Sequence, residues 1–258
     1  MMLKDKTLVV CGSGPGLSSE IARGALRDGA NLVLAARTEK KLQALADELQ
    51  APDRIAIAVT DIREEDDCKK LAGIAHDRFG GVDALALVAA VDNTFGNVMD
   101  ADIETWRNAL ETNVIGASLA VRALVPQMRS RGGGSIILIG SQSSFVPQMP
   151  QIGYASSKGA MITAMYYMAQ ELGPDRIRVN TVVPTWMWGP PVQGYVKLMS
   201  HKEKVSEEEI IAGITKDMPL GEIPKDEDVA EAVLFLASDR ARMITGQHLL
   251  VNAGEHMP

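Results

Sequence analysis

The sequence predicts an α/β fold, a doubly wound parallel sheet of about seven strands with helices on both faces. Two observations support this prediction. Short, nearly continuous apolar runs alternate with longer stretches of helical periodicity along the whole chain, and a glycine-rich turn joins the first apolar run to the first helical stretch. Regular alternation of this kind is typical of parallel sheets, because parallel strands need a crossover, usually a helix, between them.

The strand candidates are short apolar runs, which suit strands that are buried on both faces. In chain order they cover residues 7–11, 31–36, 54–59, 83–90, 135–139, 178–183 and 248–251. The stretches between them follow helical periodicity, and helices are expected over residues 17–27, 39–49, 64–78, 103–129, 159–172 and 227–237. No repeat and no linker divides the chain, so residues 1–258 are expected to form a single domain.

One segment interrupts the alternation. Residues 184–215 form a long insertion after the sixth strand and contain Trp186 and Trp188, two of the three tryptophans. Long irregular segments in compact domains are usually lids, binding loops or disordered regions. The apolar content favours a lid over the substrate, with a contact between subunits as the alternative.

Composition excludes several classes of function. The chain has 258 residues, a net charge of −7 and scattered basic residues, which argues against a nucleic acid as partner. Two cysteines imply no disulfide framework, and no apolar run reaches the length of a membrane span, so a cytoplasmic protein without membrane association is expected. The histidines are dispersed and predict no metal site; they are His76, His201, His248 and His256.

The glycine-rich turn predicts a site for a dinucleotide. Its expected contact residues are Gly12, Ser13, Gly14, Gly16 and Leu17. Glycines let the backbone approach a ligand closely, and N–H groups at a helix start bind a pyrophosphate without a basic side chain. Taken alone, such a turn is also what any tight connection from a strand to a helix requires.

The end of the second strand candidate indicates which dinucleotide. Ala36 stands where an acidic residue would bind the ribose 2′-hydroxyl of NAD, and Arg37 follows. An arginine without the acid favours the 2′-phosphate of NADP, although NAD stays possible. Asp61, after the third strand candidate, can accept a hydrogen bond from the adenine amino group or cap the helix that follows.

Tyr154 and Lys158 are the strongest catalytic candidates. They lie one helical turn apart and therefore project from the same helix face. An ammonium near a phenol favours the phenolate and lowers a tyrosine pKa from its usual value of about 10. This pair predicts an acid/base group for proton transfer, with Ser141 thirteen residues before Tyr154 as a hydroxyl donor.

Together these motifs resemble the short-chain dehydrogenase/reductase family over essentially the whole chain, a family with the Rossmann-type fold. The landmarks are the glycine turn, Asp61-Ile62, Asn113, Ser141, the YASSK segment that holds Tyr154 and Lys158, Arg178-Val179-Asn180 and Ile244-Thr245-Gly246. The resemblance implies a catalytic tetrad of Asn113, Ser141, Tyr154 and Lys158. In it Ser141 orients the carbonyl, Tyr154 transfers the proton, Lys158 binds the nicotinamide ribose, and Asn113 interrupts its helix to hold a water linked to Lys158. Further implied cofactor contacts are Ile62, Ala89, Ala90, Pro184 and Thr185.

Several residues depart from the family pattern. Cys11 replaces the usual threonine before the first glycine, and Ser18 replaces the third glycine. Residues 87–90 read Leu-Val-Ala-Ala in place of the usual Asn-Asn-Ala-Gly. None of these changes removes a group that performs chemistry.

The predicted function is an NADP(H)-dependent oxidoreductase that interconverts a secondary alcohol and a ketone. The alternatives are a reductase of 3-oxoacyl thioesters on an acyl carrier protein and a non-catalytic nucleotide-binding relative. A hydrophobic or aromatic substrate is expected, because the residues placed to cover the reacting carbon are mostly apolar: Phe145, Met149, Trp186, Trp188 and Tyr195. The resemblance also implies a homo-oligomer, most simply a tetramer.

Overall fold

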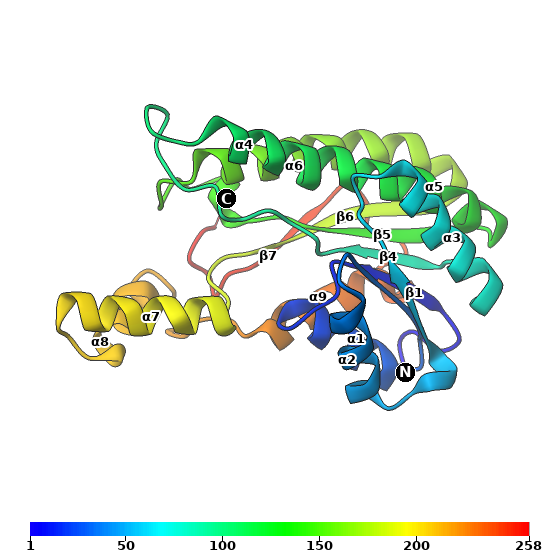
Figure 1. The fold of residues 1–258 in the computed structure, drawn as a ribbon, viewed down its shortest axis with the longest axis horizontal. Coiled ribbons are helices and arrows are strands. Elements are labelled where there is room, and N and C mark those ends of the chain that lie inside the picture. The colour runs from blue at the N-terminus through cyan, green and yellow to red at the C-terminus, as the bar shows by residue number, and fades with distance from the viewer. Residues whose placement is uncertain (258) are drawn as a thin grey trace.

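The computed structural model describes residues 1–257, and within this range the strands form one parallel sheet with helices on both faces (Figure 1). The order across the sheet is β3-β2-β1-β4-β5-β6-β7. The strands span Thr7–Cys11 (β1), Asn31–Ala36 (β2), Ile55–Val59 (β3), Ala84–Leu87 (β4), Gly134–Ile139 (β5), Ile177–Pro184 (β6) and His248–Val251 (β7). The predicted fold class is confirmed. The sheet changes its direction of growth between β1 and β4, where sheets of this kind bind ligands beyond the carboxyl ends of their strands.

Two apolar cores, one on each face of the sheet, hold the layers together. One lies under α1 (Leu17–Arg27), α2 (Glu39–Leu49) and α9 (Asp226–Ala237), and the other under α3 (Glu65–Phe79), α5 (Ala117–Ser130) and α6 (Ile152–Leu172) (Figure 1). Successive residues of β1 alternate between them, so that Leu8 and Val10 enter the first core and Val9 and Cys11 the second. Because both faces are covered, the strands are mainly apolar.

Strand β4 ends three residues earlier than expected, at Leu87. Beyond it Val88 and Ala89 both donate backbone hydrogen bonds to the carbonyl of Cys11, at 2.8 Å. Gly12 has a φ of +96°, and a Cβ at this position would lie only 2.3 Å from the backbone nitrogen of Ala89. Glycine is therefore required here both for the backbone conformation and for the close passage of two chain segments.

The long helix expected over residues 103–129 is divided. Helix α4 covers Ile103–Leu110, a π-helix follows over Glu111–Gly116, and α5 begins at Ala117. A π-turn closes its hydrogen bonds over five residues rather than four. The interruption that the family resemblance implied at Asn113 is present in this form, and Asn113 is one of its two buried residues.

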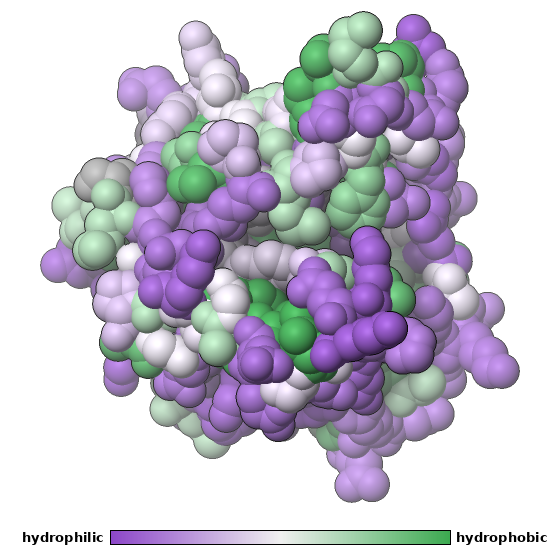
Figure 2. All heavy atoms as spheres, turned by 90° about the vertical axis from the view of Figure 1, so that its left-hand side faces the viewer, coloured by the Kyte–Doolittle hydropathy of each residue, from purple (hydrophilic) through white to green (hydrophobic). Residues whose placement is uncertain are grey.

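Residues 184–215 are not the irregular segment that the sequence analysis anticipated. They contain α7 (Pro190–Glu203) and α8 (Glu207–Thr215), which project from one end of the molecule (Figure 1). Two prolines stand in the first turn of α7, where the missing N–H is tolerated, and Ser206 and Glu209 form a capping box at the start of α8. Seen from that end, the surface carries separate hydrophobic groups among hydrophilic side chains (Figure 2).

Helix α6 begins at Ile152, seven residues before the expected start, so that Tyr154 and Lys158 lie in its first two turns. None of the helices within residues 1–257 combines the length and the apolar character needed to cross a membrane.

Candidate active site

Ser141 is held at the carboxyl end of β5. The preceding residue, Gly140, has to be small, because a Cβ there would lie 2.8 Å from a methyl carbon of Thr181 on the neighbouring strand. Ser141 Oγ accepts hydrogen bonds from the backbone N–H of Ser143 (3.2 Å) and from its hydroxyl (2.9 Å). These bonds occupy the acceptor side of Ser141, which leaves its own hydrogen to be donated.

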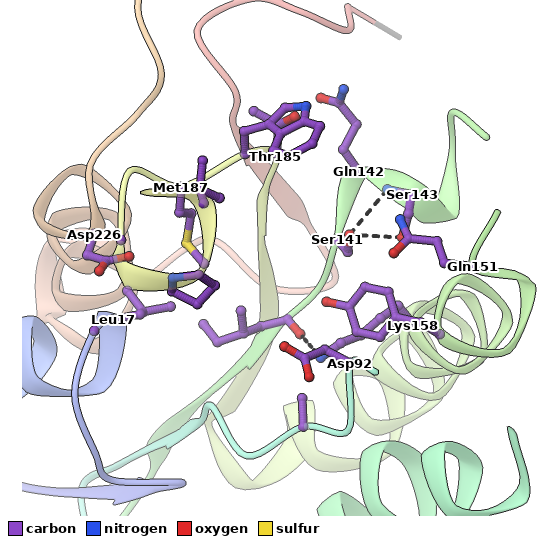
Figure 3. A pocket seen from close by; sticks show the side chains of 18 of the residues that line it. Leu17, Asp92, Ser141, Gln142, Ser143, Gln151, Lys158, Thr185, Met187 and Asp226 are labelled. Carbon is purple, nitrogen blue, oxygen red and sulfur yellow. Dashed lines mark hydrogen bonds between the residues drawn. The ribbon is translucent and has the colours of Figure 1, made fainter. Parts of the chain in front are cut away.

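Tyr154 and Lys158 lie next to Ser141, on the first turns of α6 (Figure 3 labels Lys158 and Ser141). Lys158 is only 2% exposed, and its Nζ donates a hydrogen bond to the carbonyl of Ile139 at 2.7 Å. Its Nζ is 5.7 Å from the centre of the Tyr154 ring. The end of β5 therefore holds both the serine and, through a carbonyl, the lysine.

The ionisation of this pair differs from the sequence expectation. Burial raises the pKa of Tyr154 to about 12, against a lowering by the hydrogen bond with Ser141, and the charge of Asp92 raises it further. Burial also lowers the pKa of Lys158 to about 8, which the charge of Asp92 opposes. The expectation that Lys158 would lower the pKa of Tyr154 is corrected: burial raises this pKa, and the Lys158 ammonium lies over the ring and bonds to Ile139.

Asn113 ties the π-helix to the chain beyond β4. Its Oδ1 accepts a hydrogen bond from the backbone N–H of Val91 at 2.7 Å, and its Nδ2 donates to the carbonyl of Val91 at 3.0 Å and to Ser157 Oγ at 2.9 Å. Ser157 directly precedes Lys158. The amide thereby fixes the loop after β4 and the start of α6 relative to each other, which positions the catalytic pair.

A cavity of about 310 Å³ lies beside the glycine turn. The expected cofactor residues that line it are Gly12, Ser13, Gly14, Arg37, Asp61, Ile62, Ala89 and Ala90. Nothing lies within 4 Å of a Cβ placed on Gly14, and no side chain caps the first turn of α1. An open turn, uncapped N–H groups and a nearby arginine fit a dinucleotide with phosphate groups.

Asp61 is engaged by a neighbour within this cavity. Arg63 Nε donates to Asp61 Oδ1 at 3.0 Å, and the backbone N–H of Arg63 donates to the same oxygen at 3.1 Å. The Arg63 hydrogen bonds hold the pKa of Asp61 below its ordinary value. The Asp61 carboxylate is thus ionised, and its hydrogen bonds with Arg63 already occupy part of its accepting capacity.

A larger cavity of about 490 Å³ adjoins Ser141, Tyr154, Lys158 and the helix α7 segment. Figure 3 shows Leu17, Met187 and Asp226 on one side of it and Ser141, Ser143, Gln151 and Lys158 on the other, with Thr185 between them. One part of the apolar lining comes from the segment after β6 and is here called the apolar wall; it consists of Trp186, Met187, Pro191, Val192 and Tyr195. The polar lining includes Asp92, Ser143, Gln148 and Gln151. Apolar residues therefore make up most of the lining, and the polar side chains form a smaller part of it.

Only some of the residues expected to contact the substrate line the larger cavity. Met149, Trp186 and Tyr195 line the larger cavity, and the last two are in ring contact at 5.3 Å between centroids. Phe145 is not part of the lining; it packs between His248 (5.4 Å) and His256 (6.0 Å).

Trp188 is likewise absent from this lining and instead borders a separate cavity with Glu20 and Arg23. Only Met187 separates Trp186 from Trp188, and the turn into α7 directs the two tryptophans to different sides. Pro184, expected as a cofactor contact, ends β6 and pairs with Val251 of β7.

Some residues of the site were missed by the sequence analysis. Asp92 lies near Lys158 on the loop after β4 (Figure 3), and its charge affects both catalytic pKa values. Glu255 contacts three residues of the cavity lining from beyond β7. Asp92 follows a strand end, a position that could have drawn attention to it, whereas nothing in the local sequence marks Glu255.

Comparisons with known proteins support these observations. A family model described as enoyl-(acyl carrier protein) reductase matches residues 12–256. L-rhamnose 1-dehydrogenase (NAD(P)(+)) of Azotobacter vinelandii is 34% identical over 260 residues, which cover 98% of each chain. The dehydrogenase/reductase SDR family member 4 of Rattus norvegicus is 32% identical over 254 residues, 98% of this chain and 88% of that protein.

A solved structure is also similar over the whole chain. The crystal structure of a short-chain dehydrogenase/reductase, glucose/ribitol dehydrogenase, from Brucella melitensis superposes with a TM-score of 0.89 at 27% identity, over 100% of this chain and 99% of the other.

Proposed function

The chain belongs to the short-chain dehydrogenase/reductase family, and from this premise we propose that it interconverts a secondary alcohol and a ketone with NADP(H). Membership makes it an NAD(P)-dependent oxidoreductase that acts on CH–OH groups. The observation that carries the proposal is the meeting of Ser141, Tyr154 and Lys158 at one wall of a cavity that also reaches the glycine turn.

Each side chain suits one role in this reaction. Tyr154 is neutral at physiological pH, because its pKa is about 12, and can donate its proton to a carbonyl oxygen during reduction. Ser141 accepts its two bonds from Ser143 and can donate its hydrogen to the same oxygen as negative charge develops on it. Lys158 supplies positive charge beneath the tyrosine ring. The nicotinamide, when bound, supplies or accepts the hydride at the carbonyl carbon.

The preference for NADP is supported by the residues at the end of β2. Ala36, Arg37, Thr38 and Lys41 line the cavity beside the glycine turn. Two cations and a hydroxyl, with no acid at the end of β2, suit a 2′-phosphate.

Titration of the protein with NADPH and NADH, followed by tryptophan fluorescence, tests the cofactor preference. We expect tighter binding of NADPH, and Arg37→Asp should reverse the order, because the charge at the 2′-position changes from attractive to repulsive. Lys40→Asp, an exposed change on α2 that does not line this cavity, is the matched control. Tighter binding of NADH by the parent protein would show that the cofactor proposal is wrong.

A hydrophobic or aromatic ketone or alcohol is the proposed substrate. The apolar wall supports this, because apolar surface gains roughly 25 cal/mol per Å² on burial. Trp186→Ala should raise KM for aryl ketones far more than for short-chain ketones, and Trp188→Ala, outside the cavity, should leave both unchanged. Equal effects of the two variants would rule out this wall as the substrate site.

The family model that matches the chain is described by an acyl-carrier-protein reaction, which keeps a 3-oxoacyl thioester reductase as the second candidate. The net charge of −7 disfavours an acidic carrier protein. A panel of ketones that includes a 3-oxoacyl thioester, followed by the absorbance of the reduced nicotinamide, distinguishes the two substrates.

A further inference from the structure

Glu255 holds three residues of the catalytic cavity from outside it. Its Oε2 accepts a hydrogen bond from Gln142 Nε2 at 2.8 Å and one from the hydroxyl of Thr185, and its Oε1 accepts one from Gln148 Nε2 at 2.8 Å. Gln142, Gln148 and Thr185 all line the larger cavity, whereas Glu255 does not. The carboxylate lies in the segment that follows β7 and is only partly exposed.

The three partners come from different parts of the chain. Gln142 directly follows Ser141, Gln148 lies in the loop that leads to α6, and Thr185 directly follows β6. Gln142 is almost fully buried, at 2% exposure, and its Oε1 accepts a hydrogen bond from Asn252 Nδ2 at 2.7 Å. Both Oε1 and Nε2 of Gln142 are therefore hydrogen-bonded, and Gln142 holds the Glu255 carboxylate in place.

The chemistry of a carboxylate determines which way its partners point. An ionised carboxylate has no hydrogen to donate, so Thr185 must turn its hydroxyl hydrogen toward Glu255 and Gln148 must turn its NH₂ group there. What remains for the cavity is the pair of Thr185 lone pairs, together with the carbonyl oxygen and the second N–H of Gln148. The Thr185 hydroxyl, which could otherwise donate or accept, is left as an acceptor, and the Gln148 carbonyl oxygen is left without a bond to Glu255.

A third acceptor borders the same space. Asp92 is exposed, lines the cavity and lies near Lys158 (Figure 3). Asp92, Gln148 and Thr185 thus offer oxygens to whatever occupies the cavity, which is also lined by the apolar wall around Trp186.

We propose that Glu255 is a positioning residue that sets substrate specificity: by taking the hydroxyl hydrogen of Thr185 and one amide hydrogen of Gln148, it turns acceptor oxygens of both residues toward the cavity and makes the site select an apolar ketone or alcohol that carries an additional hydroxyl group. This inference rests on the proposed alcohol and ketone chemistry and specifies its substrate class. A hydroxyl group on the substrate donates a hydrogen bond to these acceptor oxygens. A substrate without such a donor displaces the water that would otherwise bind the oxygens and leaves them without a hydrogen-bond partner.

The test compares two ketones that share an apolar body, acetophenone and its 2-hydroxy derivative. For the parent protein we expect the ratio of kcat/KM, hydroxyketone over plain ketone, to be at least tenfold higher than for Glu255→Gln. The side-chain amide of the variant carries hydrogens of its own. One of the neighbouring side chains therefore has to accept a hydrogen bond from it, and this neighbour then turns a donor group toward the cavity. The intrinsic reactivities of the two ketones cancel in this comparison between proteins.

The difference should lie in KM, because Glu255 touches neither the reacting atoms nor Tyr154. Glu171→Gln, an exposed change of the same kind on α6 outside the cavity, should keep the parent ratio. A general loosening of the site would lower both kcat/KM values equally and leave their ratio unchanged, which would overturn the proposal.

Two further measurements distinguish a failure of this inference from misfolding of a variant and from a failure of the proposed function. Gln148→Leu removes one acceptor directly from an exposed loop and should lower the ratio even if Glu255→Gln does not fold; an unchanged ratio in this variant also overturns the proposal. Binding of the two ketones by calorimetry in the presence of NADP⁺ repeats the comparison without turnover. Absence of all ketone reduction by the parent would refute the proposed function, and equal binding of both ketones to parent and Glu255→Gln would refute the role of Glu255.

Discussion

Lys158 is a charged side chain in a position where the fold would otherwise accept an apolar one. It is among the largest side chains that are almost completely buried, and its Nζ donates a hydrogen bond to the carbonyl of Ile139. Burial of a cation opposes its charged form, which is why its pKa falls to about 8. The residue therefore lowers the stability of the fold for the sake of the site.

Replacement of Lys158 by Met should make the protein more stable at neutral pH. The folded pKa of about 8 lies below the ordinary value of 10.5, so the unfolded chain binds more protons between these values. The destabilisation by Lys158 is complete below about pH 8 and disappears as the pH rises through 10.5; at full size it is roughly 3 kcal/mol. Loss of the bond to Ile139 reduces the gain.

Urea unfolding of parent and Lys158→Met at pH 7 and pH 10, followed by circular dichroism, measures this effect. The variant should gain stability at pH 7, and the gain should shrink at pH 10. A difference between the two proteins that does not change with pH would contradict the assignment of a buried charge.

Replacement of Tyr154 by Phe removes the proton donor and keeps the ring. Turnover should fall by about 10² to 10⁴-fold, the usual contribution of an acid/base group, while NADPH binds within about twofold of the parent affinity. Initial rates and a fluorescence titration with NADPH measure the two quantities. Turnover within about threefold of the parent would exclude Tyr154 as the acid.

At the scale of elements, the glycine turn performs two separable tasks. Gly12 allows β1 to pass against Ala89 and has a positive φ, whereas Gly14 has empty space where a side chain would project. The first glycine therefore serves the fold, and the second serves the expected ligand.

Alanine substitutions should separate these tasks. Gly12→Ala should lower the free energy of unfolding by about 3 kcal/mol or more, because the new Cβ would lie 2.3 Å from the Ala89 nitrogen in a strained backbone conformation. Gly14→Ala should change stability by less than about 0.5 kcal/mol yet weaken NADPH binding. Thermal unfolding and fluorescence titration provide the two measurements, and equal loss of stability in both variants would contradict this division.

The sequence predicted the order of strands and helices because this order follows from local periodicity, which each segment displays by itself. It also located Ser141, Tyr154 and Lys158, whose spacing on a strand end and one helix face is local as well. Phe145 and Trp188 were placed in the pocket by their apolar character, yet direction depends on the turns that carry them. Glu255 escaped notice because its partners are between 70 and 113 residues away in the chain, a relation that no local pattern records.

At the scale of the whole molecule, apolar side chains remain exposed on the outer layer. Met161 and Met165 of α6 pack in the core. Tyr166 and Tyr167 of the same helix are 45% and 68% exposed. A helix with one face in the core and a second apolar face at the surface is typical of a subunit contact.

A homo-oligomer, most simply a tetramer, remains the prediction for the protein in solution. Light scattering coupled to size exclusion at micromolar concentration should give about four times the chain mass of 27.7 kDa. Tyr167→Glu should reduce the assembly size if this face forms the contact, because a charge would be buried without a partner. A parent protein of 27.7 kDa would refute the prediction.

The π-helix over Glu111–Gly116 makes the catalytic geometry depend on how many residues the chain has as well as on which residues they are. A helix advances by about 100° per residue, because 3.6 residues complete a turn. Deletion of one residue from this stretch would let α4 and α5 join as an ordinary helix, but Asn113 would then point away from Val91 and Ser157. A lineage could therefore lose this support of its active site through a single three-nucleotide deletion, with every catalytic side chain still present in its sequence.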